Sequence, residues 1–189
     1  NSCPAPASIT LTAPSDSVSV SIDTSNNVSC NGGSDGMAGT SISGGISPYT
    51  YLWSPGSQTT AIASGLAANT YSVVATDNNG CTSQRSVVLT EPTPLLGSVG
   101  SFSNVTCNGN ANGIINMNVS GGTPPYSHSW SNGRSTGTVT NLGPGTFTDT
   151  IRDAKGCMVI VSQPISEPGG AVGIPASSLS STDVNCFGG

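Results

Sequence analysis

The stretch Ser17–Ile22 reads SVSVSI, with valine or isoleucine at every second position. Successive side chains of a β-strand point to opposite faces, so this alternation predicts a strand with one apolar and one polar face. The same alternation recurs at Thr70–Val73 (TYSV), and glycine or proline interrupts the pattern about every 8–12 residues. Strong helix formers are scarce throughout the chain. The sequence therefore predicts an all-β fold made of many short antiparallel strands.

A second feature is an internal repeat. Cys30–Gly36 reads CNGGSDG, Cys107–Gly113 reads CNGNANG, and Cys186 opens a partial copy (CFGG) at nearly the same spacing. A parallel series of cysteines recurs with almost the same period: Cys3, Cys81 and Cys157. Tandem copies of one module are typical of chains built for length and surface display, whereas an enzyme rarely needs its whole fold twice.

The repeat divides the chain into modules. We expect the end of a preceding repeat at 1–16, complete repeats at 17–92 and 93–168, and the start of a following repeat at 169–189. Strands are expected near 17–23, 37–44, 49–54, 59–64, 70–76 and 82–90, and again near 95–102, 114–120, 126–131, 136–141, 146–152 and 158–165. Six or seven short strands in a module of this size predict an immunoglobulin-like β-sandwich. Short proline-bearing junctions predict that the tandem sandwiches form an elongated array.

Charge and hydropathy exclude two classes of partner. Only 7% of the residues are charged, the net charge is −5, and the cations are Arg85, Arg134, Arg152 and Lys155. Four cations are too few for a nucleic-acid track or a membrane-binding patch. No stretch approaches the roughly 18–20 apolar residues that a bilayer requires. We therefore expect no nucleic-acid partner and no membrane-spanning segment.

Six cysteines accompany a single histidine, His128, and no CxxC spacing occurs. This pattern argues against zinc and favours disulfides, which implies an oxidising, extracytoplasmic setting. Neighbour pairing, which leaves no cysteine over, is the scheme we expect: Cys3–Cys30, Cys81–Cys107 and Cys157–Cys186. Two alternatives stay open: body pairing (Cys30–Cys81 and Cys107–Cys157), and a cross-module bond such as Cys30–Cys157. Whichever scheme holds, reduction is expected to lower the melting temperature or the unfolding force.

Aromatic residues recur at equivalent places in the two modules. Trp53 and Trp130 occupy the motifs PYTYLWS and PYSHSWS. One interpretation is an aromatic stripe that stacks on sugars, but each module has few other large residues, so we expect both tryptophans in the core. Tyr71 and Phe147 lie at a corner where, in related sandwiches, a tyrosine hydroxyl ties back to the backbone. We expect a structural role for both, and only Tyr71 carries the hydroxyl.

The polar residues of the second module predict no catalysis. Serines flank His128, but adjacent strand residues point to opposite faces, and Tyr51 takes this position in the first module. Asp149 falls at an inward position, where burial alone would be costly. We expect it to lie at a frayed edge or to pair with Arg134 or Arg152. No catalytic residue is predicted, and the chain is not expected to be an enzyme.

The alternative to a protein without cofactors is one that binds calcium. Oxygen ligands cluster at two turns of the first module: Asp35 with Asn31 and Ser34, and Asp77 with Asn78 and Asn79. The second module has Asn112 in place of Asp35 and Lys155 in place of Asn79, and a cation opposes a metal site. We therefore expect turn chemistry, no metal site and no cofactor.

Several motifs together resemble a known repeat family. In the first module these motifs are VSCNGG (28–33), SGG (43–45), PYTYLWS (48–54) and TDNNGC (76–81), and the second module has matching motifs from VTC (105–107) to RDAKGC (152–157). They are similar to the SprB repeats of cell-surface gliding adhesins in Bacteroidota. The resemblance covers nearly the whole chain. It implies a very long extracellular filament on the cell surface, exported by the type IX secretion system and moved during gliding motility. It also implies that Ser17 and Thr150, which follow aspartates, fit a short O-glycosylation pattern of these bacteria.

Together these observations predict a non-enzymatic, structural and adhesive repeat of a long cell-surface filament, stiffened by disulfides. Its expected partners are neighbouring repeats of the same chain and an extracellular surface or polysaccharide. The alternative is a carbohydrate-binding module region of a secreted protein, with exposed aromatic side chains. Burial of Trp53 and Trp130 distinguishes the two, because a buried indole cannot stack on sugar.

Overall fold

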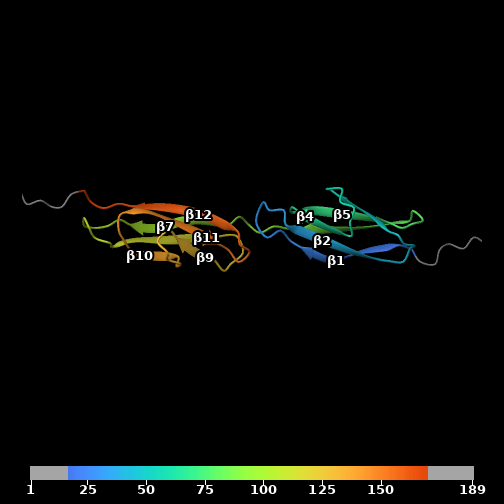
Figure 1. Cartoon of the computed structure of the whole chain (residues 1–189), viewed down its shortest axis with the longest axis horizontal. Coiled ribbons are helices and arrows are strands. Elements are labelled where there is room, and N and C mark those ends of the chain that lie inside the picture. The colour runs from blue at the N-terminus through green and yellow to red at the C-terminus, as the bar shows by residue number, and fades with distance from the viewer. Residues whose placement is uncertain (1–16, 170–189) are drawn as a thin grey trace, which may run out of the picture. The chain divides into compact units, whose positions relative to one another are not determined.

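The structure is a computed structural model that describes residues 17–169 (Figure 1). Within this range all helical or extended elements are β-strands, with no helix among them, and all strand pairs are antiparallel. The first six strands are β1 (Ser19–Asn26), β2 (Gly36–Ser43), β3 (Thr50–Ser54), β4 (Ile62–Leu66), β5 (Asn69–Thr76) and β6 (Thr82–Leu89). The next six are β7 (Leu96–Ser103), β8 (Gly113–Ser120), β9 (Ser127–Trp130), β10 (Thr138–Leu142), β11 (Gly145–Arg152) and β12 (Met158–Ile165). The all-β prediction is confirmed.

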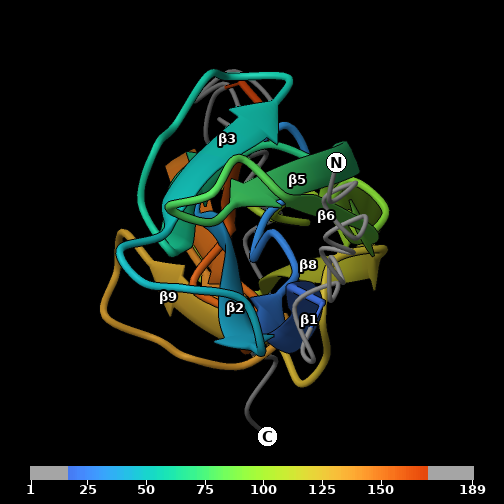
Figure 2. The same ribbon diagram turned by 90° about the vertical axis from the view of Figure 1, so that its right-hand side faces the viewer.

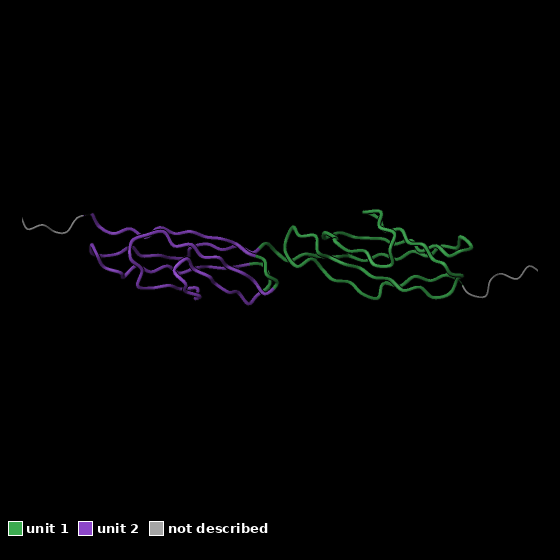
Figure 3. The backbone as a smooth tube through the Cα atoms, in the orientation of Figure 1, with its two compact units in different colours: residues 1–94, 121–123, 155–157 green, residues 95–120, 124–154, 158–189 purple. Residues whose placement is uncertain are grey.

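The chain folds into two compact units (Figure 3). Unit 1 extends to Pro94 and also contains Gly121–Thr123 and Lys155–Cys157. Unit 2 contains Leu95–Ser120, Pro124–Ala154 and, of the described residues, also 158–169. Strands β1–β6 therefore lie in unit 1 and β7–β12 in unit 2. Two short loops of the second repeat, Gly121–Thr123 and Lys155–Cys157, therefore belong to unit 1.

Unit 1 is a sandwich of two three-stranded sheets, with strand orders β1-β2-β4 and β3-β5-β6. Figure 2 shows β3, β5 and β6 in one layer and β1 and β2 in the layer facing it. Alternate residues of β5 are buried, because one face of the strand packs inward. The core draws on both sheets: Val20, Ala38, Trp53, Ala63, Leu66, Tyr71, Val73, Ala75 and Leu89.

Unit 2 repeats this arrangement with strand orders β10-β8-β7 and β12-β11-β9. Most of its buried apolar residues take equivalent places, in the set Val105, Ile115, Met117, Trp130, Val139, Leu142, Ile151 and Ile165. Even the register irregularity recurs, between Ile22 and Thr24 in β1 and between Val99 and Ser101 in β7. The predicted immunoglobulin-like sandwich is thus present in each unit.

The aromatic residues of the repeats lie in or against these cores. The exposed fraction is 1% for Trp53 and 4% for Trp130, and each indole Nε1 donates a 2.9 Å hydrogen bond to a backbone carbonyl, of Thr60 and Thr136 respectively. The hydroxyl of Tyr71 donates to the carbonyl of Ala67 (3.1 Å), which closes the corner before β5. The equivalent Phe147 is half-buried and packs against the second core.

Glycine is required where the loop after β8 approaches the linker. Gly121 has φ +71°, and a Cβ there would collide with the carbonyl oxygen of Pro94. The next residue, Gly122, donates its backbone N–H to the carbonyl of Thr93 (2.9 Å). These two glycines let the Gly121–Thr123 loop lie against the linker at the end of the first repeat, within unit 1.

Candidate functional site

A disulfide joins Cys30 to Cys157, with a Cα–Cα distance of 5.6 Å and a sequence separation of 127 residues. Both cysteines are half-buried, whereas Cys81 and Cys107 are exposed free thiols. The bond has one cysteine from each repeat, yet both belong to unit 1, because the hairpin tip Lys155–Cys157 is part of that unit.

The predicted pairs Cys3–Cys30, Cys81–Cys107 and Cys157–Cys186 are therefore wrong. Cys30 and Cys157 are bonded to each other, and Cys81 and Cys107 are unbonded. Neighbour pairing assumed that the strand after Cys81 would return beside the strand before Cys107. Instead β6 pairs with β5 and β7 with β8, in different units. Cys3 and Cys186 lie outside the described residues.

The loop that carries Cys30 is fixed by the carboxylate of Glu91. One carboxylate oxygen accepts the backbone N–H of Gly32 (2.7 Å), and the other accepts the side-chain amide of Asn31 (2.9 Å). Within the loop, Gly33 donates to the carbonyl of Cys30 (2.9 Å). Sequence reasoning treated the Glu-Pro junctions only as linkers. The signal it missed was the glutamate that precedes proline at both junctions.

Asp35 closes the other side of the same loop. It is exposed and accepts the backbone N–H of Ser29 (2.9 Å). Hydrogen bonds from the side chain and backbone of Ser29 hold the pKa of Asp35 below its usual value, and the charge of Lys155 lowers that pKa further. The carboxylate of Asp35 is therefore ionised near neutral pH and faces a cation contributed by the second repeat.

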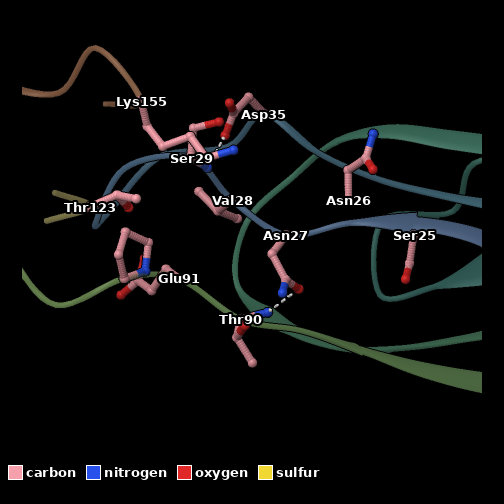
Figure 4. Close-up of a pocket in the computed structure, with 11 residues that line it drawn as sticks. Ser25, Asn26, Asn27, Val28, Ser29, Asp35, Thr90, Glu91, Thr123 and Lys155 are labelled. Atoms are coloured by element: carbon pink, nitrogen blue, oxygen red, sulfur yellow. Dashed lines mark hydrogen bonds between the residues drawn. The ribbon is translucent and has the colours of Figure 1, made fainter. Parts of the chain in front are cut away.

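A polar pocket of about 740 Å³ lies in unit 1 beside these residues (Figure 4). Figure 4 shows Asp35, Ser29 and Lys155 along one side and Glu91 and Thr123 nearby. The remaining lining residues are Ser25, Asn26, Asn27, Val28, Thr90 and Pro92. The lining thus offers hydroxyls, amides, two carboxylates and one ammonium, and it contains no aromatic side chain. Such a surface suits hydrogen bonding to a polar partner rather than stacking.

Asp77 organises the β5–β6 hairpin of the first repeat. Its Oδ1 accepts the backbone N–H groups of Asn79 (2.9 Å) and Cys81 (2.8 Å), and its Oδ2 accepts that of Ile46 (3.1 Å). Burial alone would raise the pKa of Asp77, but the three N–H donors outweigh it and lower the pKa below 3.8. The carboxylate therefore ties the hairpin to the Gly44–Ile46 loop.

The candidate calcium ligands Asp35 and Asp77 are engaged in hydrogen bonds to the backbone. Both oxygens of Asp77 accept backbone N–H groups, and one oxygen of Asp35 does so as well. In the range 17–169, no three His, Cys, Asp or Glu residues are placed to hold a metal ion together. The absence of a cofactor stays a prediction.

The second core contains a polar pair that the first core lacks. Asp149 is fully buried, and its Oδ2 lies 2.6 Å from Nδ1 of His128, whose side chain is 12% exposed. The backbone N–H of Ser129 donates to the other oxygen of Asp149 (3.1 Å). The predicted partners Arg134 and Arg152 are wrong, because both are exposed while Asp149 points into the sandwich.

The pair could have been found in the sequence. Both positions differ together from the first repeat, which has Tyr51 for His128 and Val73 for Asp149. Two coordinated changes at inward positions indicate contact. The carboxylate is inaccessible to solvent, and both of its oxygens are hydrogen-bonded within the core.

The two predicted glycosylation residues differ in accessibility. Ser17 is exposed, just before β1, and Thr150 is half-buried in β11. In β11, Thr150 is paired across to Ser129 and Ile160 in the neighbouring strands. Glycosylation at both residues stays a prediction, and Ser17 is the more accessible.

These observations define a class: a tandem β-sandwich repeat protein whose interstrand loops carry the cysteines and the polar pocket. The SprB repeat family matches at residues 22–58 and 99–135, two segments that are offset by the same interval as Cys30 and Cys107. The chain therefore carries two matches to the SprB repeat, and the resemblance predicted from its motifs is confirmed. No sequence among curated proteins matches the chain significantly.

Solved structures with a similar arrangement come from several sources. The three N-terminal domains of the bacteriophage RB49 highly immunogenic outer capsid protein match with 16% identity and TM-score 0.48, over 81% of this chain and 59% of that one. Extracellular domains 3–5 of Drosophila OTK match with 14% identity and TM-score 0.34, over 79% and 59% of the two chains. Domains 4–9 of the surface layer protein SbsC match with 15% identity and TM-score 0.28, over 85% and 31%.

Within residues 17–169, no helix could serve as a membrane span.

Proposed function

We propose that this chain is a non-enzymatic, structural and adhesive segment of a long cell-surface filament, a gliding-motility adhesin exported by the type IX system. The observation that carries the proposal is the disulfide between Cys30, inside the first SprB match, and Cys157, which follows the second match in the same sequence repeat (93–168). A covalent link between successive repeats serves a chain that transmits force. It has no evident use in a soluble binding module.

The position of the disulfide supports a mechanical role. When the chain is pulled from its ends, tension passes through the Cys30–Cys157 bond rather than through the 127-residue segment it closes. At about 3.4 Å per extended residue, the bond withholds roughly 430 Å of extension. Most of both repeats is then shielded from unfolding by force, so the filament stays short and stiff under load.

The polar groups support a non-enzymatic role. Enzymes place a nucleophile, a base and an orienting group around an accessible reacting atom. Here the His128–Asp149 pair lies in a core, and the carboxylates of Asp77 and Glu91 hold backbone N–H groups. Each of these groups has a structural partner, which accounts for its presence without catalysis.

The carbohydrate-binding alternative receives less support. Both tryptophans are buried, and their Nε1 atoms are bonded to the backbone. The pocket of about 740 Å³ lacks an aromatic platform, although its amides and carboxylates suit hydrogen bonds to sugar hydroxyls. A polysaccharide is therefore a candidate for the adhered surface rather than for a dedicated lectin site.

Labelling of live cells tests the proposal. An antibody raised against this chain should label intact cells of the producing bacterium, and the label should move along gliding cells. Deletion of the coding segment should reduce attachment and gliding on a surface. Labelling that requires permeabilised cells, or unchanged attachment after the deletion, would contradict the proposed function. Retention of the purified chain on polysaccharide beads with no change in gliding would favour the carbohydrate-binding alternative.

A further inference from the structure

We propose that Cys107 and Cys81 belong to two docking surfaces for further SprB repeats, each sealed by a disulfide. Cys107 would bond to the cysteine equivalent to Cys157 in the following repeat, and Cys81 to the cysteine equivalent to Cys30 in the preceding repeat. The inference deepens the proposed function, since it rests on an array of such repeats, and it names the bond that would hold each repeat to the next.

The pairing rule comes from the bond already in the chain. Each repeat carries an early cysteine, Cys30 or Cys107, and a late one, Cys81 or Cys157. The structure joins the early cysteine of the first repeat to the late cysteine of the second. One early and one late cysteine remain among the described residues, and both are exposed. They are the two residues that the same rule would pair with outside repeats.

The loop of Cys107 has the same internal hydrogen bonds as the bonded loop of Cys30. Glu167 accepts the backbone N–H of Gly109 (3.0 Å), as Glu91 accepts that of Gly32 (2.7 Å). The backbone N–H of Asn110 donates to the carbonyl of Cys107 (3.1 Å), as that of Gly33 donates to the carbonyl of Cys30 (2.9 Å). Likewise, the backbone N–H of Thr106 donates to the side-chain oxygen of Asn112 (3.1 Å), as that of Ser29 donates to the carboxylate of Asp35 (2.9 Å). The loop therefore adopts its bonding shape without a partner.

The surface around Cys81 is equivalent to the part of the second repeat that belongs to unit 1. Gly121–Thr123 and Lys155–Cys157 are in unit 1, and their equivalents in the first repeat are residues 44–46 and 79–81. Asp77 fixes these two segments to each other through Ile46 and Cys81. They line a second pocket, of about 190 Å³, together with Val18.

Apolar exposure at this surface also indicates a protein partner. Ile46 is 50% exposed next to the exposed thiol of Cys81. Its equivalent, Thr123, is half-buried in unit 1. A large apolar side chain beside a rigid hairpin is stabilised when another surface covers it. The matching surface that the chain itself provides is the early-cysteine loop of a repeat.

Charge at the two surfaces is compatible with this occupant. In unit 1 the anionic Asp35 faces the cationic Lys155. At the two unbonded surfaces the equivalent residues are Asn112 and Asn79, both neutral. Docking of another repeat with neutral residues at these places buries no unpaired charge, which would otherwise oppose association.

The bond formation balances as a thiol–disulfide exchange. Each of the two cysteine thiols loses one proton and one electron as the new S–S bond forms. A low-molecular-weight disulfide accepts the two electrons and two protons, its own S–S bond breaks, and it leaves as two thiols. An oxidising extracytoplasmic setting supplies such an oxidant.

A lengthened chain tests the pairing rule. In the full chain with Cys3→Ser and Cys186→Ser, residues 93–168 are inserted once more after Pro168, which preserves the repeat register. The inserted copy carries Lys155→Asn, so that no unpaired ammonium is set against Asn112. Both chains are oxidised in a buffer of a small thiol and its disulfide, and thiols are counted after denaturation. The parent should show two thiols, Cys81 and Cys107, and the lengthened chain should also show two. The reason is that the inserted repeat adds two cysteines and the new bond uses two. Four thiols in the lengthened chain would overturn the proposal.

Two matched variants identify the bond. Cys107→Ser in the original second repeat should raise the count of the lengthened chain from two thiols to three. The same substitution in the inserted repeat should lower it to one. The reverse result would show that the two cysteines of the inserted repeat pair with each other, and would also overturn the proposal. Failure here, with surface labelling of cells still positive, leaves a filament whose repeats lack this bond, so the two proposals fail separately.

Discussion

The two repeats have the same sandwich but differ at one place in the core. In the first repeat Trp53 lies opposite Val73, and Tyr51 packs against the core. In the second, Trp130 lies opposite Asp149, and His128 takes the place of Tyr51. An apolar pair has been exchanged for a hydrogen-bonded polar pair. This core therefore tolerates a buried carboxylate when the neighbouring residue changes with it.

A third position differs in the same neighbourhood. Gly137 stands in the second repeat where the first has Ala61, and both backbone carbonyls accept an N–H from the adjacent sheet strand, of Met117 and Thr40 respectively. A Cβ at Gly137 would lie 3.2 Å from Nε2 of His128, tighter than an ordinary carbon contact. The missing methyl group gives the imidazole its space.

The largest expected change in stability and extension comes from the early cysteines of the two repeats, because Cys30 is disulfide-bonded and Cys107 is not. Cys30→Ser removes the bond to Cys157, and loop-closure entropy for 127 residues is worth about 5 kcal/mol. Pulled from its ends, the variant should gain roughly 430 Å of extension over the wild type. Single-molecule force spectroscopy measures this directly.

The equivalent residue provides the control for that experiment. Cys107→Ser removes a thiol that is exposed and unbonded in this chain. It should leave the extension and the melting temperature unchanged. If reduction or Cys30→Ser gave the same extension as the oxidised wild type, the disulfide would not carry the tension.

The next largest effect comes from separating the polar pair. His128→Tyr restores the residue of the first repeat but leaves Asp149 buried without its partner, which should cost about 3–5 kcal/mol. Adding Asp149→Val should recover most of that loss, because Tyr51 and Val73 show that the fold accepts the apolar pair. Unfolding in denaturant, with the indole N–H signals of Trp53 and Trp130 read separately by NMR, assigns the change to unit 2. Equal losses in the single and double variants would show that the pair is not coupled.

The sequence predicted much of this fold because the alternation of apolar residues and the repeat are local signals. The twelve expected strands lie within a few residues of the observed ones. The disulfide could not be derived in this way, since Cys30 and Cys157 are 127 residues apart and the pairing depends on which unit the Lys155–Cys157 tip joins. The role of Glu91 was hidden for the same reason, because its partners in the Cys30 loop lie about 60 residues away in sequence.

A pH-dependent difference should follow from Asp77. Its pKa in the folded protein is below 3.8, so its stabilising effect is complete above that value and is lost as the pH falls through the folded pKa. Asp77→Asn should therefore lower the melting temperature of unit 1 at pH 7, by less than the loss at His128, because the amide keeps one acceptor oxygen. The wild type and variant should converge in acid. Trp130 serves as the internal control, since unit 2 should not respond, and a constant difference down to pH 2 would contradict this role.

The smallest effect compares the corner residues. Tyr71→Phe removes the bond from the hydroxyl to Ala67 and should cost about 1 kcal/mol, or about 4–8 °C in the melting temperature of unit 1. Phe147→Tyr offers unit 2 the same hydroxyl, with Gly143 in the place of Ala67. Because Phe147 is half-buried, the new hydroxyl can reach that carbonyl or remain in water, so the expected gain is below about 1 kcal/mol. If Phe147→Tyr lowered the stability of unit 2, the backbone of this corner would have a conformation that does not allow the tyrosine hydrogen bond. The two corners would then differ in backbone as well as in side chain.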